Sequence, residues 1–171
     1  MTQPGLVNKL RAQDGLYAVR VAGAKGIEWH VPGALWQTSV ATTERQNVLN
    51  AIAAPSTRWI TLTVTEKGYT PALAQLLIDG LRLRHAAGLT GLTIASCDNL
   101  QGNGHKLKAI IHAASTTQDA ELVKWIEAHC AFPCSMVDRI VPAATDEVAA
   151  AAKEALGMQD ECALSTETFW E

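Results

Sequence analysis

The sequence predicts an α/β fold in which a largely parallel sheet is flanked by helices and preceded by a β-hairpin. Two observations lead to this prediction. Short runs of β-branched and aromatic residues alternate with longer segments whose apolar positions recur at helical spacing. Near the N-terminus, a glycine-containing turn joins two alternating segments. The 171 residues are enough for one domain with a sizeable core.

The first predicted elements are the two strands of the hairpin and a helix. Residues 16–22 and 27–31 alternate in part between apolar and polar types, and the turn between them contains two glycines. A helix is expected at about 43–53, where a threonine precedes apolar residues that share one face. It ends before Pro55, because the residue before a proline disfavours helical geometry.

The middle of the chain has the pattern of a strand, a helix and a second strand. Residues 59–65 are rich in β-branched and aromatic types and predict a strand that includes Trp59 in the core. Thr70 and Pro71 are typical of the cap and first position of a helix, which Gly88 ends. Residues 91–96 form the next strand. A right-handed crossover between parallel strands places such helices on the faces of the sheet.

Three further helices and an extended segment are predicted in the remainder of the chain. One helix begins after Gly104, and another occupies about 118–129. A short strand or extended segment follows at 136–141. Thr145 and the acidic residues after it then start an alanine-rich helix that ends at Gly157.

The composition excludes several classes of protein. Hydrophobic residues make up 48% and charged residues 18%, which is typical of a globular chain. The net charge of −3 disfavours nucleic acid and anionic membrane surfaces as partners, since both attract a positive field. No apolar run approaches the roughly 20 residues that span a bilayer. The first residues lack the basic and apolar regions of a signal peptide, so we expect a cytoplasmic location.

The four cysteines do not form a metal-binding pattern. No Cys-x-x-Cys pair occurs among them. His129, Cys130 and Cys134 are close in sequence, but a zinc site usually needs four ligands and no second cluster follows. We therefore predict reduced, half-buried cysteines and no metal.

Polar residues gather in three loops that follow predicted strands, at 65–69, 97–105 and 135–139. In parallel sheets, ligands bind at the carboxyl ends of the strands. The second loop places Asp98 and Asn99 just after a strand and two glycines just before a helix. Local sequence leaves two interpretations open: an anion site at the helix N-terminus, or a glycine-containing turn capped by Asp98 or Asn99. The dinucleotide fingerprint is incomplete, because its third glycine is replaced by Leu107.

Three stretches in sequence order add a resemblance. They are TLTVTEKGY at 61–69, SCDNLQGNGH at 96–105 and FPCSMVDRIVP at 132–142. Together with LRAQDGLY at 10–17, they are similar to stretches of the long-chain mannitol dehydrogenase family, which includes mannitol and arabinitol dehydrogenases and fructuronate and tagaturonate reductases. The short connection after Tyr69 most resembles the fructuronate reductase (mannonate oxidoreductase) branch.

This resemblance implies an oxidoreductase that transfers a hydride between NAD and a secondary alcohol or ketone of a polyol or sugar acid, without a metal. It implies an N-terminal Rossmann-type domain and a helical C-terminal domain. Asn99 would donate to the developing oxyanion of the substrate as a catalytic residue. Thr65, Glu66, Val137 and Asp138 would bind the nicotinamide side of the cofactor.

The resemblance also implies parts that the sequence does not contain. A glycine-rich phosphate loop before Leu10 and a catalytic lysine of the C-terminal domain have no counterpart here. We therefore expect residues 1–171 to be a partial, incomplete Rossmann-like domain, with weak or absent NAD binding and no practical turnover by itself. The alternative is a truncated, non-catalytic module that forms a homodimer through exposed sheet edges or binds a small molecule.

Overall fold

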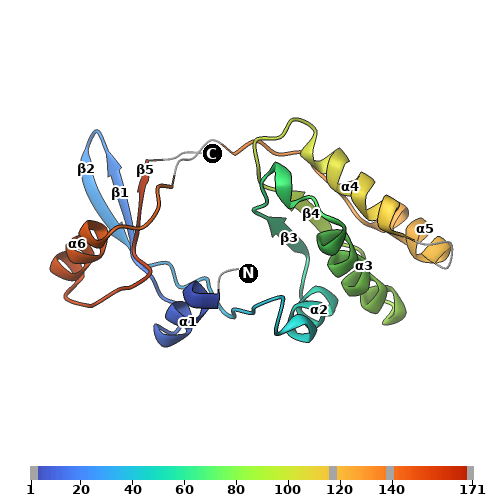
Figure 1. The fold of residues 1–171 in the computed structure, drawn as a ribbon, viewed down its shortest axis with the longest axis horizontal. Coiled ribbons are helices and arrows are strands. Elements are labelled where there is room, and N and C mark those ends of the chain that lie inside the picture. Colours follow the sequence, from blue (N-terminus) through green and yellow to red (C-terminus); the bar gives the residue numbers. More distant parts are fainter. Residues whose placement is uncertain (1–3, 116–118, 138–140, 169–171) are drawn as a thin grey trace. The chain divides into compact units, whose positions relative to one another are not determined.

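The computed structural model describes residues 4–115, 119–137 and 141–168 (Figure 1). It divides into two compact units, and each is described by itself. The described residues of 1–44 and 139–171 form unit 1, and those of 45–138 form unit 2. Unit 1 therefore combines the two ends of the chain, whereas unit 2 is continuous in sequence.

Unit 1 contains a three-stranded sheet with the strand order β2-β1-β5. Strands β1 (Val19–Gly23) and β2 (Gly26–His30) pair antiparallel, which confirms the predicted hairpin. Strand β5 (Leu164–Glu167) pairs parallel with β1, with Val19 opposite Leu164. The sequence analysis did not predict β5, since its four residues are largely polar and its partner strand is distant in sequence.

Two helices belong to unit 1: α1 (Pro4–Ala12), which was not predicted, and α6 (Asp146–Leu156). The Thr145 hydroxyl accepts a hydrogen bond from the Val148 amide at 3.4 Å, and Gly157 ends α6 with a φ of 71°. Both predicted signals of this helix are thus confirmed. A small core of Ala18, Ala152 and Ala163 joins α6 to the sheet.

Unit 2 contains two parallel strands and four α-helices. Strands β3 (Trp59–Leu62) and β4 (Thr93–Ser96) pair with Trp59 opposite Thr93, and Ala131 adds a parallel bridge on the other side of Thr93. The helices are α2 (Arg45–Ala53), α3 (Pro71–Ala86), α4 (Asn103–Ala114) and α5 (Ala120–His129). The predicted order of strands and helices is confirmed in this unit.

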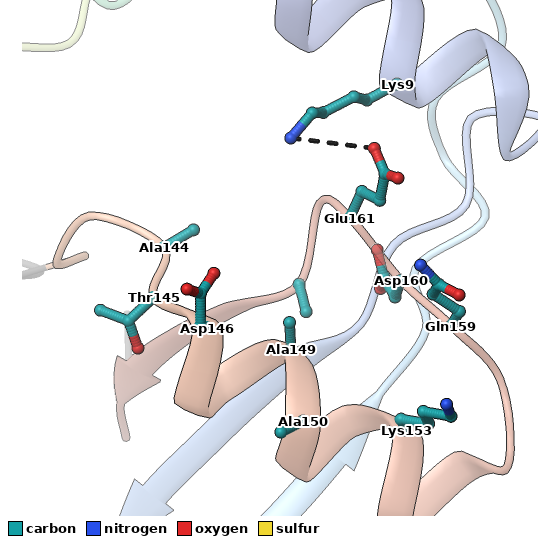
Figure 2. Close-up of a pocket in the computed structure, with 11 residues that line it drawn as sticks. Lys9, Ala144, Thr145, Asp146, Ala149, Ala150, Lys153, Gln159, Asp160 and Glu161 are labelled. Carbon is teal, nitrogen blue, oxygen red and sulfur yellow. Dashed lines mark ion pairs between the residues drawn. The ribbon is translucent and has the colours of Figure 1, made fainter.

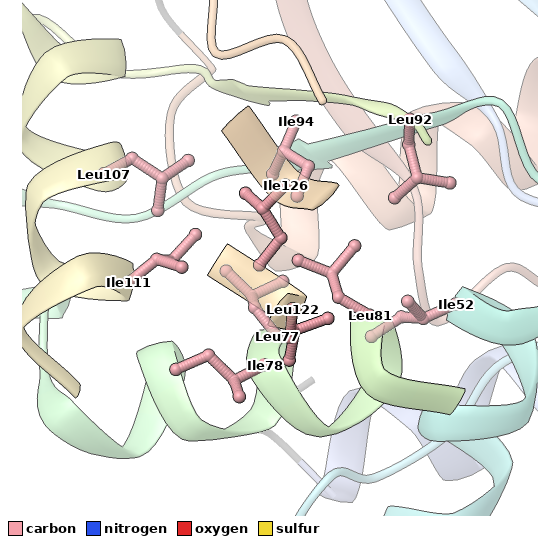
Figure 3. Close-up of a cluster of buried hydrophobic side chains, with 10 residues drawn as sticks. All are labelled: Ile52, Leu77, Ile78, Leu81, Leu92, Ile94, Leu107, Ile111, Leu122 and Ile126. Carbon is pink, nitrogen blue, oxygen red and sulfur yellow. The ribbon is translucent and has the colours of Figure 1, made fainter. Parts of the chain in front are cut away.

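The core of unit 2 lies between the strands and the helices (Figure 3). It consists of leucine and isoleucine side chains: Ile52, Leu77, Ile78, Leu81, Leu92, Ile94, Leu107, Ile111, Leu122 and Ile126. Beside it, the fully buried Arg84 donates to the carbonyl oxygens of Ile52 at 3.0 Å, Ala54 at 2.7 Å and Thr90 at 3.0 Å. These bonds occupy carbonyl groups at the end of α2 and hold the α3–β4 connection, which offsets part of the cost of burying the cation.

Some predictions about the strands are wrong in detail. Strand β3 ends at Leu62 rather than residue 65, so the next residues leave the sheet. Trp59 is 65% exposed rather than part of the core. For 136–141, predicted as a short strand or an extended segment, the described residues Met136, Val137 and Val141 form no strand, and 138–140 lie outside the described residues. The parallel pairs also lie in two sheets instead of one.

Candidate functional site

A cavity of about 530 Å³ opens at the carboxyl ends of β3 and β4 in unit 2. Its lining is formed by residues that follow the two strands and by one residue from a later segment: Thr63, Val64, Thr65, Glu66, Cys97, Asp98, Asn99, Leu100 and Val137. The structure thus brings together four of the five predicted site residues, Thr65, Glu66, Asn99 and Val137. The fifth, Asp138, lies outside the described residues.

The first wall of the cavity follows β3. After Leu62 the chain leaves the sheet and continues to Thr65, which has φ −82° and ψ 172°. A 3-10 turn, η1 (Glu66–Gly68), then begins, and the Gly68 amide donates to the Thr65 carbonyl at 2.7 Å. The turn fixes the backbone here while the side chains of Thr65 and Glu66 remain exposed.

The second wall follows β4. The Cys97 amide donates to the Leu62 carbonyl at 2.7 Å, which extends the pairing of the two strands by one step. The Asp98 carboxylate then accepts from the Leu100 amide at 3.3 Å and turns the chain. Asn99 lies between Asp98 and Leu100, which this bond fixes. It is exposed, and its carboxamide has no hydrogen-bond partner among the described residues. Its amide donors are therefore available to a ligand.

A buried polar network lies under this loop. The Tyr69 hydroxyl donates to Asp98 Oδ2 at 2.7 Å and lies 2.6 Å from the Ser96 hydroxyl. Asn103 Nδ2 donates to Asp98 Oδ1 at 2.7 Å. The sequence analysis missed Tyr69 and Asn103 as site residues. One signal was present: Asn103 is four positions before Leu107, so a polar side chain lies on the apolar face of α4.

The network keeps Asp98 ionised. Burial acts to raise the pKa of Asp98, but hydrogen bonds from Tyr69, Asn103 and the Leu100 amide, with the charge of Lys106, outweigh it and lower this pKa below its usual value. Burial, together with the adjacent carboxylate, raises the pKa of Tyr69. At neutral pH Asp98 is thus a carboxylate acceptor and Tyr69 a neutral donor, and both are occupied by the structure itself.

The two glycines at the start of α4 have structural roles. Gly102 has a φ of 71°, which favours glycine. A Cβ at Gly104 would lie 2.4 Å from the Phe132 carbonyl oxygen, so glycine is needed for the close approach of that backbone. The Gly104 amide donates to Asn103 Oδ1 at 2.8 Å, and the Lys106 amide donates to the Gly102 carbonyl. Of the two interpretations, the turn capped by Asp98 is confirmed, and the anion site stays a prediction.

A second cavity, of about 510 Å³, belongs to unit 1 (Figure 2). Alanines on α6 form one side, and Lys9 and Glu161 lie on the other, with Lys9 Nζ 3.8 Å from the Glu161 carboxylate. Both charged side chains are about half exposed. The buried Asp160 accepts from the Ala18 amide, the Cys162 amide and Gln13 Nε2, so its carboxylate is fully used in holding the loop.

The described residues also bear on metal binding and on membrane insertion. In the part of the chain that the structure describes, no three His, Cys, Asp or Glu side chains are grouped so as to hold a metal ion. Among the described helices, none has both the length and the apolar character needed to cross a bilayer.

Comparison with protein families finds a match over the whole sequence. Residues 1–171 match the family described as the mannitol dehydrogenase Rossmann domain. The chain is 36% identical to D-mannonate oxidoreductase of Escherichia coli (strain K12) over 190 residues, covering 96% of this chain and 39% of that protein. It is 33% identical to mannitol 2-dehydrogenase of Aspergillus terreus, covering 94% and 37% respectively. The chain thus spans well under half the length of these relatives.

Solved structures give the same result for the fold. The mannitol 2-dehydrogenase of Pseudomonas fluorescens, in a ternary complex with NAD and D-mannitol, matches with a TM-score of 0.85 and 28% identity over 95% of this chain and 38% of that one. A substrate-free D-sorbitol dehydrogenase matches with a TM-score of 0.85 and 30% identity over 95% of this chain and 39% of that one. The Rossmann-like α/β prediction is therefore confirmed.

Proposed function

This chain belongs to the mannitol dehydrogenase family, and on that premise we propose that it forms one wall of the site of an NAD-dependent oxidoreductase. The reaction interconverts an alcohol of a polyol or sugar acid and its ketone. One observation carries the proposal: the Asn99 carboxamide, which no described residue bonds, lies in a cavity at the carboxyl ends of two parallel strands. This is where ligands bind in α/β sheets of this kind.

The cavity has a suitable size and lining for a nicotinamide ring and a small substrate. Its volume of about 530 Å³ lies within the range of small-molecule sites. Val137 offers an exposed apolar surface, and Thr65 and Glu66 offer hydrogen-bonding groups. We assign these three residues and Asp138 to cofactor binding. When bound, NAD supplies the hydride acceptor or donor.

Asn99 is the residue to which we assign catalysis. Its side-chain N–H can donate to the substrate oxygen, where negative charge develops as the alcohol and ketone interconvert. A preorganised neutral donor stabilises that charge without needing to change its own protonation state. The adjacent Asp98 does not act as a base, because Tyr69 and Asn103 already occupy its carboxylate.

The substrate class is a sugar acid of the mannonate and fructuronate type. Support comes from the 36% identity to D-mannonate oxidoreductase and from the short connection after Tyr69. The mannitol 2-dehydrogenases and D-sorbitol dehydrogenase make hexitols the alternative substrates. A cytoplasmic location is part of the proposal, since all four cysteines are free thiols, as is usual in a reducing compartment.

The test is a substrate panel with the complete gene product that contains residues 1–171. Mannonate, mannitol and sorbitol are assayed with NAD and with NADP, and fructuronate and fructose with the reduced cofactors. The proposal expects NAD-dependent turnover that saturates, with sugar acids preferred. Absence of turnover with every pair, or full activity of an Asn99→Ala variant, would contradict it.

A non-catalytic module is the competing function. One observation favours it: β2 is a terminal strand of the unit 1 sheet, and its Ile27 side chain is 54% exposed, so this edge is open to pairing with a second copy. Light scattering of the protein with and without NAD separates the two. A dimer that binds no NAD and is dissociated by an Ile27→Lys change would favour the module.

A further inference from the structure

Asn103 connects the two parts of the chain that line the cavity. Its side chain is fully buried, and it lies at the start of α4. One part is the loop after β4 that carries Asn99, and the other is the segment that ends at Val137. These parts are separated in sequence, so their relative position depends on contacts between them.

The hydrogen bonds of Asn103 use its full capacity. Nδ2 donates to the Asp98 carbonyl at 3.1 Å, to Asp98 Oδ1 at 2.7 Å and to the Ser135 carbonyl at 2.9 Å. Oδ1 accepts from the Gly104 amide at 2.8 Å and from the Ser135 amide at 3.0 Å. Both main-chain groups of Ser135 are thus bound by one carboxamide, which has two donor hydrogens and two acceptor positions.

Two neighbouring contacts bring residues 132–135 close to the start of α4 and the end of β4. Gly104 lets the Phe132 and Pro133 carbonyl groups lie directly against the start of α4. The Ser135 hydroxyl donates to the Ser96 carbonyl at the end of β4. Since the segment is held at both points, Asn103 determines how its next residues reach the cavity.

We infer that Asn103 is a positioning residue for Asn99: its buried carboxamide fixes the Asn99 loop against the 135–137 segment, so that the proposed oxyanion donor and the proposed nicotinamide contact face one cavity. This inference rests on the proposed function. Asn103 does not touch the ligand, because its side chain has no exposed surface. It acts through Asp98 on one side and Ser135 on the other.

Replacing Asn103 with aspartate separates the donor role of its carboxamide nitrogen from the acceptor role of its oxygen. It keeps the oxygen that accepts from Gly104 and Ser135, but it loses the amide donors. It also places a second carboxylate beside Asp98, where Nδ2 now lies 2.7 Å from Oδ1, and two like charges at this distance repel. The change therefore removes the bonds to Asp98 and to the Ser135 carbonyl, and it keeps the acceptor for the Gly104 and Ser135 amides.

The test is a double-mutant cycle in the complete gene product, with Asn99→Ala, Asn103→Asp and the double variant. We expect Asn103→Asp to lower kcat about ten-fold or more while KM for NAD changes less, since small misplacements of a catalytic group are costly. In the Asn99→Ala background the same change should have little further effect. Asn47→Asp, on the exposed face of α2, is the matched control.

Two results would overturn the inference. One is an unchanged kcat in folded Asn103→Asp. The other is a fall in kcat by the same factor with and without Asn99, because a merely structural defect acts on both proteins equally. If Asn103→Asp does not fold, Asn103→Ser takes its place in the cycle, since it replaces the two amide donors with one shorter hydroxyl and adds no charge.

A second readout separates this inference from the proposed function. If the wild-type gene product has no turnover with any substrate, the proposed function fails, and hydrogen exchange of residues 1–171 then decides the inference. Asn103→Ser should expose the amides of Leu100 and Ser135 together, while the Cys97 amide, bonded to Leu62, stays protected. Unchanged protection at Leu100 or Ser135 would contradict it.

Discussion

The two cavities are similar in volume but differ in how their polar groups are bonded. The cavity in unit 2 is supported by buried polar groups, Asp98 and Asn103, while its Asn99 donor has no partner among the described residues. In the cavity of unit 1, Lys9 and Glu161 pair with each other at the surface, and the buried Asp160 is used by the backbone around it. The first arrangement fixes the residues on either side of a free amide donor, whereas in the second Lys9, Glu161 and Asp160 are bonded within the chain.

This difference shows why volume alone does not identify a site. A ligand gains specificity from polar groups that are fixed but not yet bonded. Asn99 meets both conditions in the described part of the chain: Asp98 and Leu100 on either side of it are bonded to each other, and its own carboxamide has no partner there. Variants of Asn99, Asp98, Thr145 and Lys9 test this difference between the cavities.

Removing the Asn99 side chain should have the largest effect. We expect Asn99→Ala to lower kcat/KM of the complete gene product by about 10²–10³-fold, the usual loss for one oxyanion donor. Stability should not change, since the side chain is exposed. Steady-state kinetics and urea unfolding measure the two effects. A loss of less than about three-fold would remove Asn99 from catalysis.

Asp98→Asn should destabilise unit 2 and alter its pH dependence. Hydrogen bonds to a charged group typically contribute about 1.5–3 kcal/mol, so we expect the free energy of unfolding to fall by about 2 kcal/mol. Because folding lowers the pKa of Asp98, its stabilisation is present above the usual aspartate pKa and is lost as pH falls through the folded-state value. Urea unfolding at neutral and acidic pH measures both.

The control for this variant is Asp14→Asn, which changes an exposed carboxylate in unit 1. It should leave the urea midpoint and its pH dependence nearly as in the wild type. If Asp98→Asn is equally silent at neutral pH, then the network under the Asn99 loop does not hold that loop.

Removing the cap of α6 should affect unit 1 alone. We expect Thr145→Ala to lower the free energy of unfolding by about 1 kcal/mol, since the Val148 amide loses its side-chain acceptor and keeps only the Thr145 carbonyl. NAD affinity should stay the same. Thr145→Ser keeps the hydroxyl and should restore the wild-type urea midpoint. A change in NAD affinity without a change in the free energy of unfolding would indicate that NAD binds near α6.

The smallest effect is expected for Lys9→Ala. The pair with Glu161 is exposed and 3.8 Å long, so it should contribute less than about 1 kcal/mol. NAD affinity, measured by calorimetry, should also be unchanged. A large loss of affinity would mean that the unit 1 cavity binds the cofactor.

The sequence predicts the elements of this fold best where local signals are complete. Helix α3 has a threonine cap and a proline at its first position, and α6 has Thr145 and Gly157. By contrast, β5 is defined by its pairing with β1, and β3 ends early although Thr63, Val64 and Thr65 favour a strand. In both cases the tertiary arrangement overrides the local preference.

The site was predictable in part for the same reason. Loops at the carboxyl ends of strands indicated where Thr65, Glu66 and Asn99 meet. The buried network under these residues was not predictable, because Asn103 hydrogen-bonds to a segment 32 positions away in the sequence. Spacing along one helix cannot show which distant backbone its carboxamide meets.

The central claim is that the cavity with Asn99, and not the one beside Lys9, binds the ligands. Hydrogen exchange of the complete gene product with and without NAD and mannonate or mannitol tests it most directly. We expect new protection at 63–66, 97–100 and 135–137, and none at 144–153. Protection confined to 144–161, with no change at 97–100, would contradict it.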